Sequence, residues 1–548
     1  MAITNVKNLF GNFRGDLFGG ITAGVIALPL ALAFGVASGA GAAAGLYGAI
    51  LVGFFASLFG GTKPQVSGPT GPMTVVLASI IALHPGNFKV IFFTIILAGL
   101  FQILLGVLKI GKLIRYVPYP VISGFMSGIG VIIIILQINP LFGLGIEGNT
   151  INSLVNFFNN IGAANIHAII LGLITLSIVF LTPQKIAKNV PPSLTALIFV
   201  TMLSVFLGWD VATIGEIPTS LPSFNLPLVP IQDLRYIIPF AITLSILGSV
   251  DSLLTSLAVD SLTKTNHNPD KELIGQGIGN MMAGLFGGIC GAGATMRTVV
   301  NIKTGGKTPL AGIIHSIFLV LVLIWLAPYA KFIPMTVLAG ILIKVGFDII
   351  DYKFIKVIRH APKRDLAVML LVFGLTVFDD LIFAVGAGIV LSSLLFALSV
   401  SEQMEVQIQD VSSEPGADDD TCCTGECIEK ASNYRIRTVD IEGVFFFGST
   451  SRILTRVDDF LDTEYLIINC KQIKDMDISA AFALQDIVHR LKDKNIHIML
   501  VLNNPKLMKK LLRLNVVEVI GKDNIFYSKT EAINTAKKLI YKKVNKSD

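Results

Sequence analysis

The chain has 548 residues, of which 15% are charged and 53% are hydrophobic, and its mean hydropathy is +0.72. This composition excludes an ordinary soluble globular protein and indicates a membrane protein with many spans. The net charge of +6 is small and comes mostly from short loops, so it predicts neither a nucleic-acid partner nor a polybasic lipid-binding patch.

Long uncharged runs follow one another up to about residue 402, and most are long enough to cross a bilayer as a helix. The run that starts at Leu17 lacks a small-residue cleavage site, so we expect it to remain as the first span. The sequence predicts fourteen membrane segments, near 16–37, 44–60, 70–83, 90–108, 118–137, 166–182, 193–208, 236–262, 272–288, 295–302, 309–329, 333–350, 365–378 and 382–401.

Most lysine and arginine residues of the short loops fall on one side of the membrane in this fourteen-segment arrangement. The opposite loops, 138–165 and 209–235, contain a single arginine between them. Since basic loops stay in the cytosol, we expect a plasma-membrane protein with both termini in the cytosol.

The fourteen segments divide into seven plus seven, over about 16–208 and 236–402. Because seven is odd, the second half enters the membrane from the opposite side, which predicts an inverted repeat. The two short segments, starting at Thr70 and Thr295, occupy the third position of each half. They should therefore approach the middle of the bilayer from opposite faces.

A glycine-rich break precedes each short segment, in Leu58–Val76 (LFGGTKPQVSGPTGPMTVV) and in Leu285–Val300 (LFGGICGAGATMRTVV). Glycine frees the backbone from helical geometry, and a helix that starts inside the membrane turns its N–H groups and positive dipole end inward. Two facing helix starts predict the anion site of a transporter. The simpler alternative is that these glycines only let helices pack closely.

Asp251 is a lone carboxylate within an otherwise uncharged segment, with Thr255 one turn later on the same face. These oxygens, with carbonyls freed in 291–295, could hold Na⁺, and this is the role we favour. Asp251 could instead carry a proton or pair with Arg297. Arg297 could add positive potential to the anion site, or bond a helix carbonyl.

A polar stretch at 403–432 predicts a linker between a membrane domain (1–402) and a small α/β domain (433–548). Asp477-Ile478-Ser479 stands before a helix in which Ser479 has the residue type of an N-cap. The expected elements are strands at 435–440, 444–447, 465–470 and 496–502, and helices at 451–462, 479–492, 506–512 and 530–541.

Other chemistry is not expected. Gly305-Gly306-Lys307-Thr308 imitates the end of a nucleotide-binding loop, but no strand precedes it. Histidine, cysteine and acidic residues form no cluster with catalytic or metal-binding spacing. We therefore expect no enzyme activity and no cofactor, with Na⁺ as the only metal.

The sequence resembles the SulP family of anion transporters with a C-terminal STAS domain. The motifs that carry the resemblance are GDLFGGITAGVIALPLALAFG, GLYGA, GPTGPMT, RTVVNIKTGGKTPL and KDMDISAAFAL. Within the family, VDSLLTSLAVDSLTKT, KELIGQGIGN and GAGATMRTVVN are most similar to the sodium-dependent bicarbonate transporters of the cyanobacterial BicA type.

The resemblance implies a core domain and a gate domain that move as an elevator, and a homodimer held partly by the STAS domains. It also implies two sets of ligands. The sodium set is Asp251, Thr255, Gly293 and Thr295, and the bicarbonate set is Thr70, Gly293, Ala294 and Thr295.

Three positions depart from family patterns. Leu30 replaces the glutamine of many sulfate-type members, and Arg297 replaces the glycine of the BicA type. Asp477 is not directly followed by the serine that is phosphorylated in bacterial anti-sigma antagonists.

The sequence as a whole predicts uptake of bicarbonate with Na⁺ across the bilayer, with an unidentified cytosolic regulator as a further partner and no nucleic acid. The alternatives are a proton-coupled symporter or exchanger for sulfate or a dicarboxylate, an anion channel, and a sensor led by its STAS domain.

Overall fold

The computed structural model describes residues 11–112, 117–145, 150–183, 190–217, 223–224, 226–227, 229–378, 381–402, 405–411, 435–446 and 463–544. The chain forms two compact units, Met1–Val390 and Leu391–Asp548. Each unit is described by itself below.

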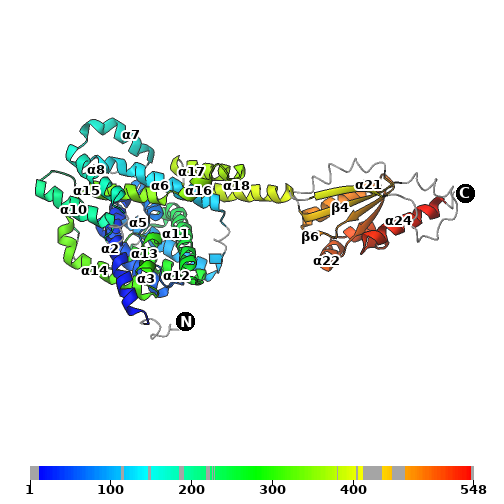
Figure 1. Cartoon of the computed structure of the whole chain (residues 1–548), viewed down its shortest axis with the longest axis horizontal. Helices are drawn as coiled ribbons and strands as arrows, with labels where there is room; N and C mark the ends of the chain where they lie inside the picture. Colours follow the sequence, from blue (N-terminus) through cyan, green and yellow to red (C-terminus); the bar gives the residue numbers. More distant parts are fainter. Residues whose placement is uncertain are drawn as a thin grey trace. The chain divides into compact units, whose positions relative to one another are not determined.

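The described residues between 11 and 402 are mainly helical, and each of the fourteen expected segments overlaps a helix, the last of which, α18, continues past residue 390 (Figure 1). Seven of the described helices are long and apolar enough to cross a membrane. The helices that match the expected segments are α2 (Phe13–Ser38), α3 (Ala42–Phe59), α4 (Gly71–Leu83), α5 (Phe88–Val107), α6 (Tyr119–Leu141), α8 (Ile166–Leu181), α10 (Pro192–Leu207), α11 (Leu234–Thr263), α12 (Pro269–Leu285), α13 (Thr295–Lys303), α14 (Leu310–Ala330), α15 (Met335–Ile349), α17 (Lys363–Phe378) and α18 (Leu381–Glu402).

Several shorter elements were not expected from the sequence. Two are helices, and both are too short to span a bilayer. They are α7 (Thr150–Asn160), which is rich in asparagine, and α16 (Tyr352–Val357); the 3₁₀ turns are η2 (Ile161–Ala163) and η3 (Ile231–Asp233).

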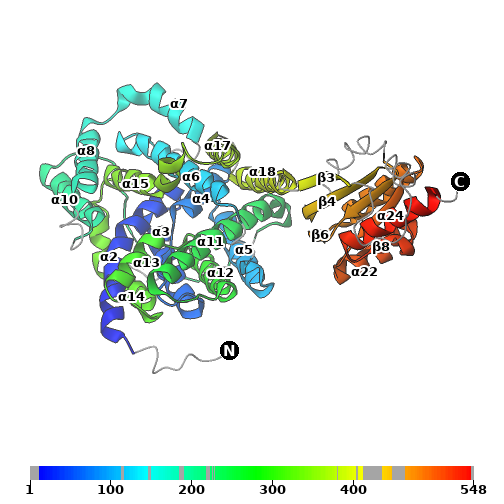
Figure 2. The same ribbon diagram turned by 45° about the vertical axis from the view of Figure 1, so that its right-hand side comes forward.

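The long helices pack in two sets. In the first set, α12 packs against α3 and α5, and α14 packs against α2 and α3. In the second set, α6 packs against α15 and α17, and α8 packs against α10 and α15. Figure 2 shows α8 and α10 at one end of this unit and α5, α11 and α12 at the other. The short helix α13 packs on α2, which comes from the other half of the chain.

The second unit is built on a mixed sheet with strand order β3-β4-β5-β7-β8, and β6 pairs with β4. The first pair is antiparallel and the other pairs are parallel. Its elements are β3 (Glu405–Val411), β4 (Ile436–Phe445), β5 (Tyr465–Asn469), β6 (Ile473–Met476), α21 (Ile478–Lys492), β7 (His497–Val501), α22 (Pro505–Arg513), α23 (Val516–Ile520), η5 (Lys522–Asn524), β8 (Ile525–Phe526) and α24 (Lys529–Val544).

Helices cover both faces of this sheet. On one face, Leu484 and Val488 of α21 and Leu511 of α22 are buried against the sheet. On the other face, Ala536 and Ile540 of α24 are buried against it. Successive residues of the central strands are buried alternately on the two faces, as expected for a parallel sheet with helices on both sides.

Two expectations for this unit need correction. The strand β3 starts inside the stretch predicted to be a linker, and it pairs along its whole length with β4, so the sheet begins earlier than composition indicated. The two strands expected at 435–440 and 444–447 are one strand, β4. The helix expected at Ser451–Asp462 lies outside the described residues.

The N-cap of α21 is Asp477, not Ser479 as the sequence indicated. The Asp477 carboxylate accepts a hydrogen bond of 2.7 Å from the Ala480 amide, and Ser479 is the second residue of the helix. The sequence interpretation failed because Asp477 and Ser479, two residues apart, are both of types that cap helices, and only the backbone geometry separates them.

An Asp477→Ala variant is expected to destabilise the first turn of α21 by about 1 kcal/mol, because an N-cap bond is lost. Hydrogen–deuterium exchange of the peptide 478–484 in the full chain should then be about fivefold faster. Ser479→Ala is the control and should exchange like the wild type. Faster exchange in Ser479→Ala and wild-type exchange in Asp477→Ala would show instead that Ser479 is the N-cap.

Candidate ion-binding site

The two glycine-rich breaks meet as a short strand pair. The strands β1 (Ser67–Gly68) and β2 (Ala292–Gly293) are antiparallel, and Ser67 lies opposite Gly293. Each strand leads within two residues into a short helix, β1 into α4 and β2 into α13. Because the strands run in opposite directions, the two helices leave the crossing in opposite directions with their N-termini near it.

Both helix starts turn their first N–H groups toward the crossing, although the Ala294 amide itself donates to the Val66 carbonyl at 3.0 Å. Thr70 caps α4 and Ala294 caps α13, and neither cap makes a side-chain hydrogen bond to its helix. The first N–H groups of a helix have no partner within the helix, and they carry the positive end of its dipole. Thr70 and Ala294 are buried, whereas the side chain of Thr295 is exposed. This arrangement suits a small anion.

Hydroxyl and carbonyl oxygens gather beside the crossing. The Thr255 hydroxyl lies 2.9 Å from the Gly293 carbonyl oxygen, to which it donates, and 2.7 Å from the Thr295 hydroxyl. The Gly293 amide donates to the Ser252 hydroxyl at 3.0 Å. Three of the four residues predicted as the sodium set are therefore in direct contact with one another.

Asp251 lies one helical turn before Thr255 on α11. Its Oδ2 atom is buried and has no hydrogen-bond partner among the described residues, and the same is true of the Thr70 hydroxyl. A buried polar atom without a partner costs free energy unless a ligand or a water bonds it. The Thr70 hydroxyl and the Asp251 carboxylate nevertheless lie near enough to interact, so a ligand bound at one oxygen would also affect the other.

Arg297 is buried in the first turn of α13, with 1% of its surface exposed. Its Nη2 atom donates to the Pro69 carbonyl at 2.6 Å, which ties α13 to the break before α4. Its Nε and Nη1 atoms have no hydrogen-bond partner within the described part of the chain. The guanidinium interacts electrostatically with the Asp251 carboxylate, so its charge is felt in the site.

Glycine is required where the two breaks cross. A Cβ atom on Gly291 would lie 2.3 Å from the Gly68 carbonyl carbon and oxygen, which are backbone atoms that cannot turn aside. The Asn280 side chain fixes the same residue, since it accepts from the Gly291 amide at 2.7 Å and donates to its carbonyl at 2.9 Å. A side chain at position 291 would force the strands apart.

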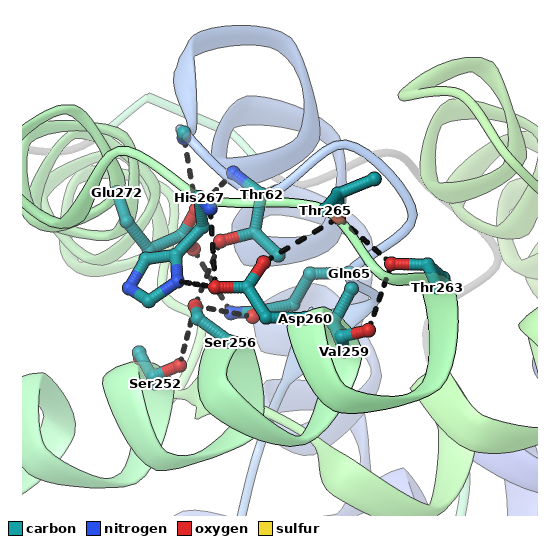
Figure 3. A network of polar contacts seen from close by, with 11 residues as sticks. Thr62, Gln65, Ser252, Ser256, Val259, Asp260, Thr263, Thr265, His267 and Glu272 are labelled. Carbon is teal, nitrogen blue, oxygen red and sulfur yellow. Dashed lines mark hydrogen bonds and ion pairs between the residues drawn. The ribbon is translucent and has the colours of Figure 1, made fainter.

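Sequence reasoning missed a row of polar side chains that supports the crossing. Glu272, Gln276 and Asn280 lie at intervals of four on α12, so they share one helical face, and all three are buried. Figure 3 shows Glu272 beside Thr62 and Gln65 of the first break. The spacing of these residues in an apolar segment was the signal that could have revealed them.

Comparison with protein-family models gives two matches. The model described as the sulfate permease family matches residues 13–372, and the model of the STAS domain matches residues 428–532.

Comparison with individual proteins gives similar results. The chain is 42% identical to the bicarbonate transporter BicA of Synechocystis sp., over 98% of this chain and 96% of that protein. A solved structure of the transmembrane domain of a cyanobacterial bicarbonate transporter BicA is 47% identical, with a TM-score of 0.64 over 70% of this chain and 98% of that one. The murine Solute Carrier 26 family member A9 has a TM-score of 0.81 at 19% identity, over 98% and 92% of the two chains, and this likeness shows the fold alone.

Proposed function

Since the chain belongs to the sulfate permease family and carries a STAS domain, we propose that it is a secondary transporter that takes up bicarbonate together with Na⁺. Its similarity to BicA proteins over nearly the whole chain supports bicarbonate as the substrate. The seven apolar helices support a place in the bilayer, with the plasma membrane as the proposed compartment.

The observation that carries the sodium part is the oxygen cluster around Thr255. Its hydroxyl, the Thr295 hydroxyl and the Gly293 carbonyl oxygen are in contact, and Asp251 is one turn away. Carbonyls of unwound backbone and nearby oxygens are the ligands that transporters of this kind offer to Na⁺, while helix N-termini face an anion.

Coupling follows from the charges in the site. An ionised Asp251 repels an anion that approaches the two helix starts. When Na⁺ is bound, it neutralises this carboxylate, and the dipoles of α4 and α13 can then hold bicarbonate at Thr70, Ala294 and Thr295. Arg297 adds positive potential from within α13. In this scheme bicarbonate binds well only when Na⁺ is also bound, so the two ions are transported together.

The antiparallel crossing supports the inverted repeat, since it places the third segment of each half head to head. We propose that the two sets of helices are the core and the gate of an elevator. The STAS domain would hold a homodimer and receive a cytosolic regulator.

A second candidate is proton-coupled transport of sulfate or a dicarboxylate, with Asp251 as the proton carrier. The observation that favours it is the buried Oδ2 atom of Asp251, which makes no hydrogen bond of normal geometry with any described residue.

Uptake of labelled bicarbonate into proteoliposomes tests the two functions. An inward Na⁺ gradient and an inward H⁺ gradient are compared at fixed external pH, with sulfate as a second labelled substrate. Bicarbonate uptake driven by Na⁺ alone supports the proposal. Uptake driven only by H⁺, or uptake of sulfate instead, would replace it with the second candidate.

A further inference from the structure

Glu272 is a carboxylate buried at the start of α12, with 1% of its surface exposed. Its Oε2 atom accepts from the amides of Gly61 at 2.9 Å and Thr62 at 2.8 Å. Its Oε1 atom accepts from the side-chain amides of Gln65 at 2.9 Å and Gln276 at 2.8 Å. All four partners are donors, so the geometry fits an ionised carboxylate whose charge is distributed over four hydrogen bonds.

Gln65 connects this carboxylate to α11. Its amide nitrogen donates to Glu272, and its oxygen accepts from the Ser256 hydroxyl at 2.9 Å. The Ser256 hydroxyl also bonds the Thr62 hydroxyl at 2.7 Å (Figure 3). The amide of Gln65 therefore contacts Glu272 at one end and Ser256 at the other, and the Ser256 proton is shared with the Ser252 carbonyl, also at 2.9 Å.

The Gln65 amide lies against the backbone of the ion site. A Cβ atom on Gly293 would lie 2.1 Å from the Gln65 amide nitrogen and 3.1 Å from the Ser252 Cα atom. Gly293 is also the residue whose carbonyl oxygen contacts Thr255. A shift of the Gln65 amide by a few tenths of an ångström would therefore move this carbonyl oxygen or leave a gap beside it.

We propose that Glu272 and Gln65 are positioning residues for the ion site: Glu272 fixes the Gln65 amide, and the amide sets the place of the Gly293 carbonyl beside Thr255. This inference rests on the proposed sodium site. Neither residue touches the ions; both act through the backbone of β2.

The substitution Glu272→Gln separates this role from packing, because it keeps the shape of the side chain. The Gly61 and Thr62 amides are backbone donors that cannot turn, so the remaining oxygen must face them. The new NH₂ group then faces the NH₂ groups of both Gln65 and Gln276, and the donors repel one another. Gln65 has to turn, and its contact with Gly293 changes.

The experiment measures sodium-dependent bicarbonate uptake for Glu272→Gln, Gln65→Ala and the double variant in proteoliposomes, normalised to inserted protein. We expect each single variant to raise the Na⁺ concentration for half-maximal uptake about tenfold, with the maximal rate within about twofold of the wild type. Because Glu272 acts through Gln65, the double variant should also show about tenfold, not about a hundredfold.

The matched control is Asn139→Ala. Asn139 is a buried amide in α6 of the other set of helices, and it bonds the Ser153 carbonyl and hydroxyl. This variant should alter the amount of inserted protein without changing the Na⁺ dependence. An unchanged half-saturating Na⁺ concentration in both single variants, or independent effects that multiply in the double variant, would overturn the proposal.

Hydrogen–deuterium exchange of the peptide 285–300 tests the positioning role directly, without relying on sodium-dependent transport. Both single variants should exchange faster in this peptide than the wild type and than Asn139→Ala. If wild-type uptake proved independent of Na⁺, the proposed function would fail, and the exchange result would still decide whether Glu272 and Gln65 hold β2. Unchanged exchange would reject that support.

Discussion

An Asp251→Asn variant is expected to lose Na⁺-driven bicarbonate uptake at low Na⁺ by about tenfold to a hundredfold, while it still inserts and folds. Asparagine keeps the shape of the side chain but removes the charge that Na⁺ would neutralise. The loss of contacts between a charge and its ligand is worth about 1.5–3 kcal/mol, which corresponds to a tenfold to hundredfold change in affinity. Labelled uptake in proteoliposomes, at saturating Na⁺ and at low Na⁺, measures the effect.

Asp260→Asn is the control for this prediction. Asp260 lies nine positions after Asp251 on the same helix, pairs with His267 at 2.6 Å and forms no hydrogen bond or ion pair with the described residues of β1 or β2. Its substitution removes the same charge from α11 and should leave Na⁺-dependent uptake within about twofold. Normal uptake by Asp251→Asn would exclude this carboxylate from coupling.

A Gly291→Ala variant is expected to abolish binding of both ions, since one methyl group at this position overlaps the Gly68 backbone. Either β1 moves away from β2 or the break before α13 changes its path. In both cases the Thr70 and Ala294 helix starts lose their alignment. Uptake should fall below about 1% of the wild-type rate, because a misplaced site of about 1 Å costs about a hundredfold.

Gly374→Ala is the matched control, because no atom lies within 4 Å of the Cβ that it adds to α17. This variant should insert and transport like the wild type. Retention of full transport by Gly291→Ala would show that the strand crossing adapts and that the site does not depend on its register.

The sequence predicted the helices of the membrane unit well, and the reasons are physical. Long uncharged runs can only span a bilayer as helices, so their number and places follow from composition. The helix starts at Thr70 and Thr295 followed from glycine breaks, and the helices begin at Gly71 and Thr295. The sequence predicted that the two helix starts face each other; that the two breaks pair as strands, with Ser67 opposite Gly293, needed the structure.

The sequence did not predict what holds the crossing in place. Glu272 was counted as the edge of a membrane segment, although three of its four donors come from Gly61, Thr62 and Gln65 of the distant first break. The role of a buried carboxylate can be assigned only when its hydrogen-bond donors are known. Here tertiary folding brings those donors together from distant parts of the sequence. The partner of Arg297 was open for the same reason, since the Pro69 carbonyl lies 228 positions away.

The strand crossing also has a consequence for biogenesis. The Val66 amide bonds the Thr298 hydroxyl, and these residues lie 232 positions apart. The first break therefore leaves the ribosome and enters the bilayer long before its partner has been translated. Until then, its backbone groups have no strand to pair with in a medium without water. A nascent chain that stops short of β2 cannot complete this pairing, so assembly of the site is a late step that needs both halves of the chain.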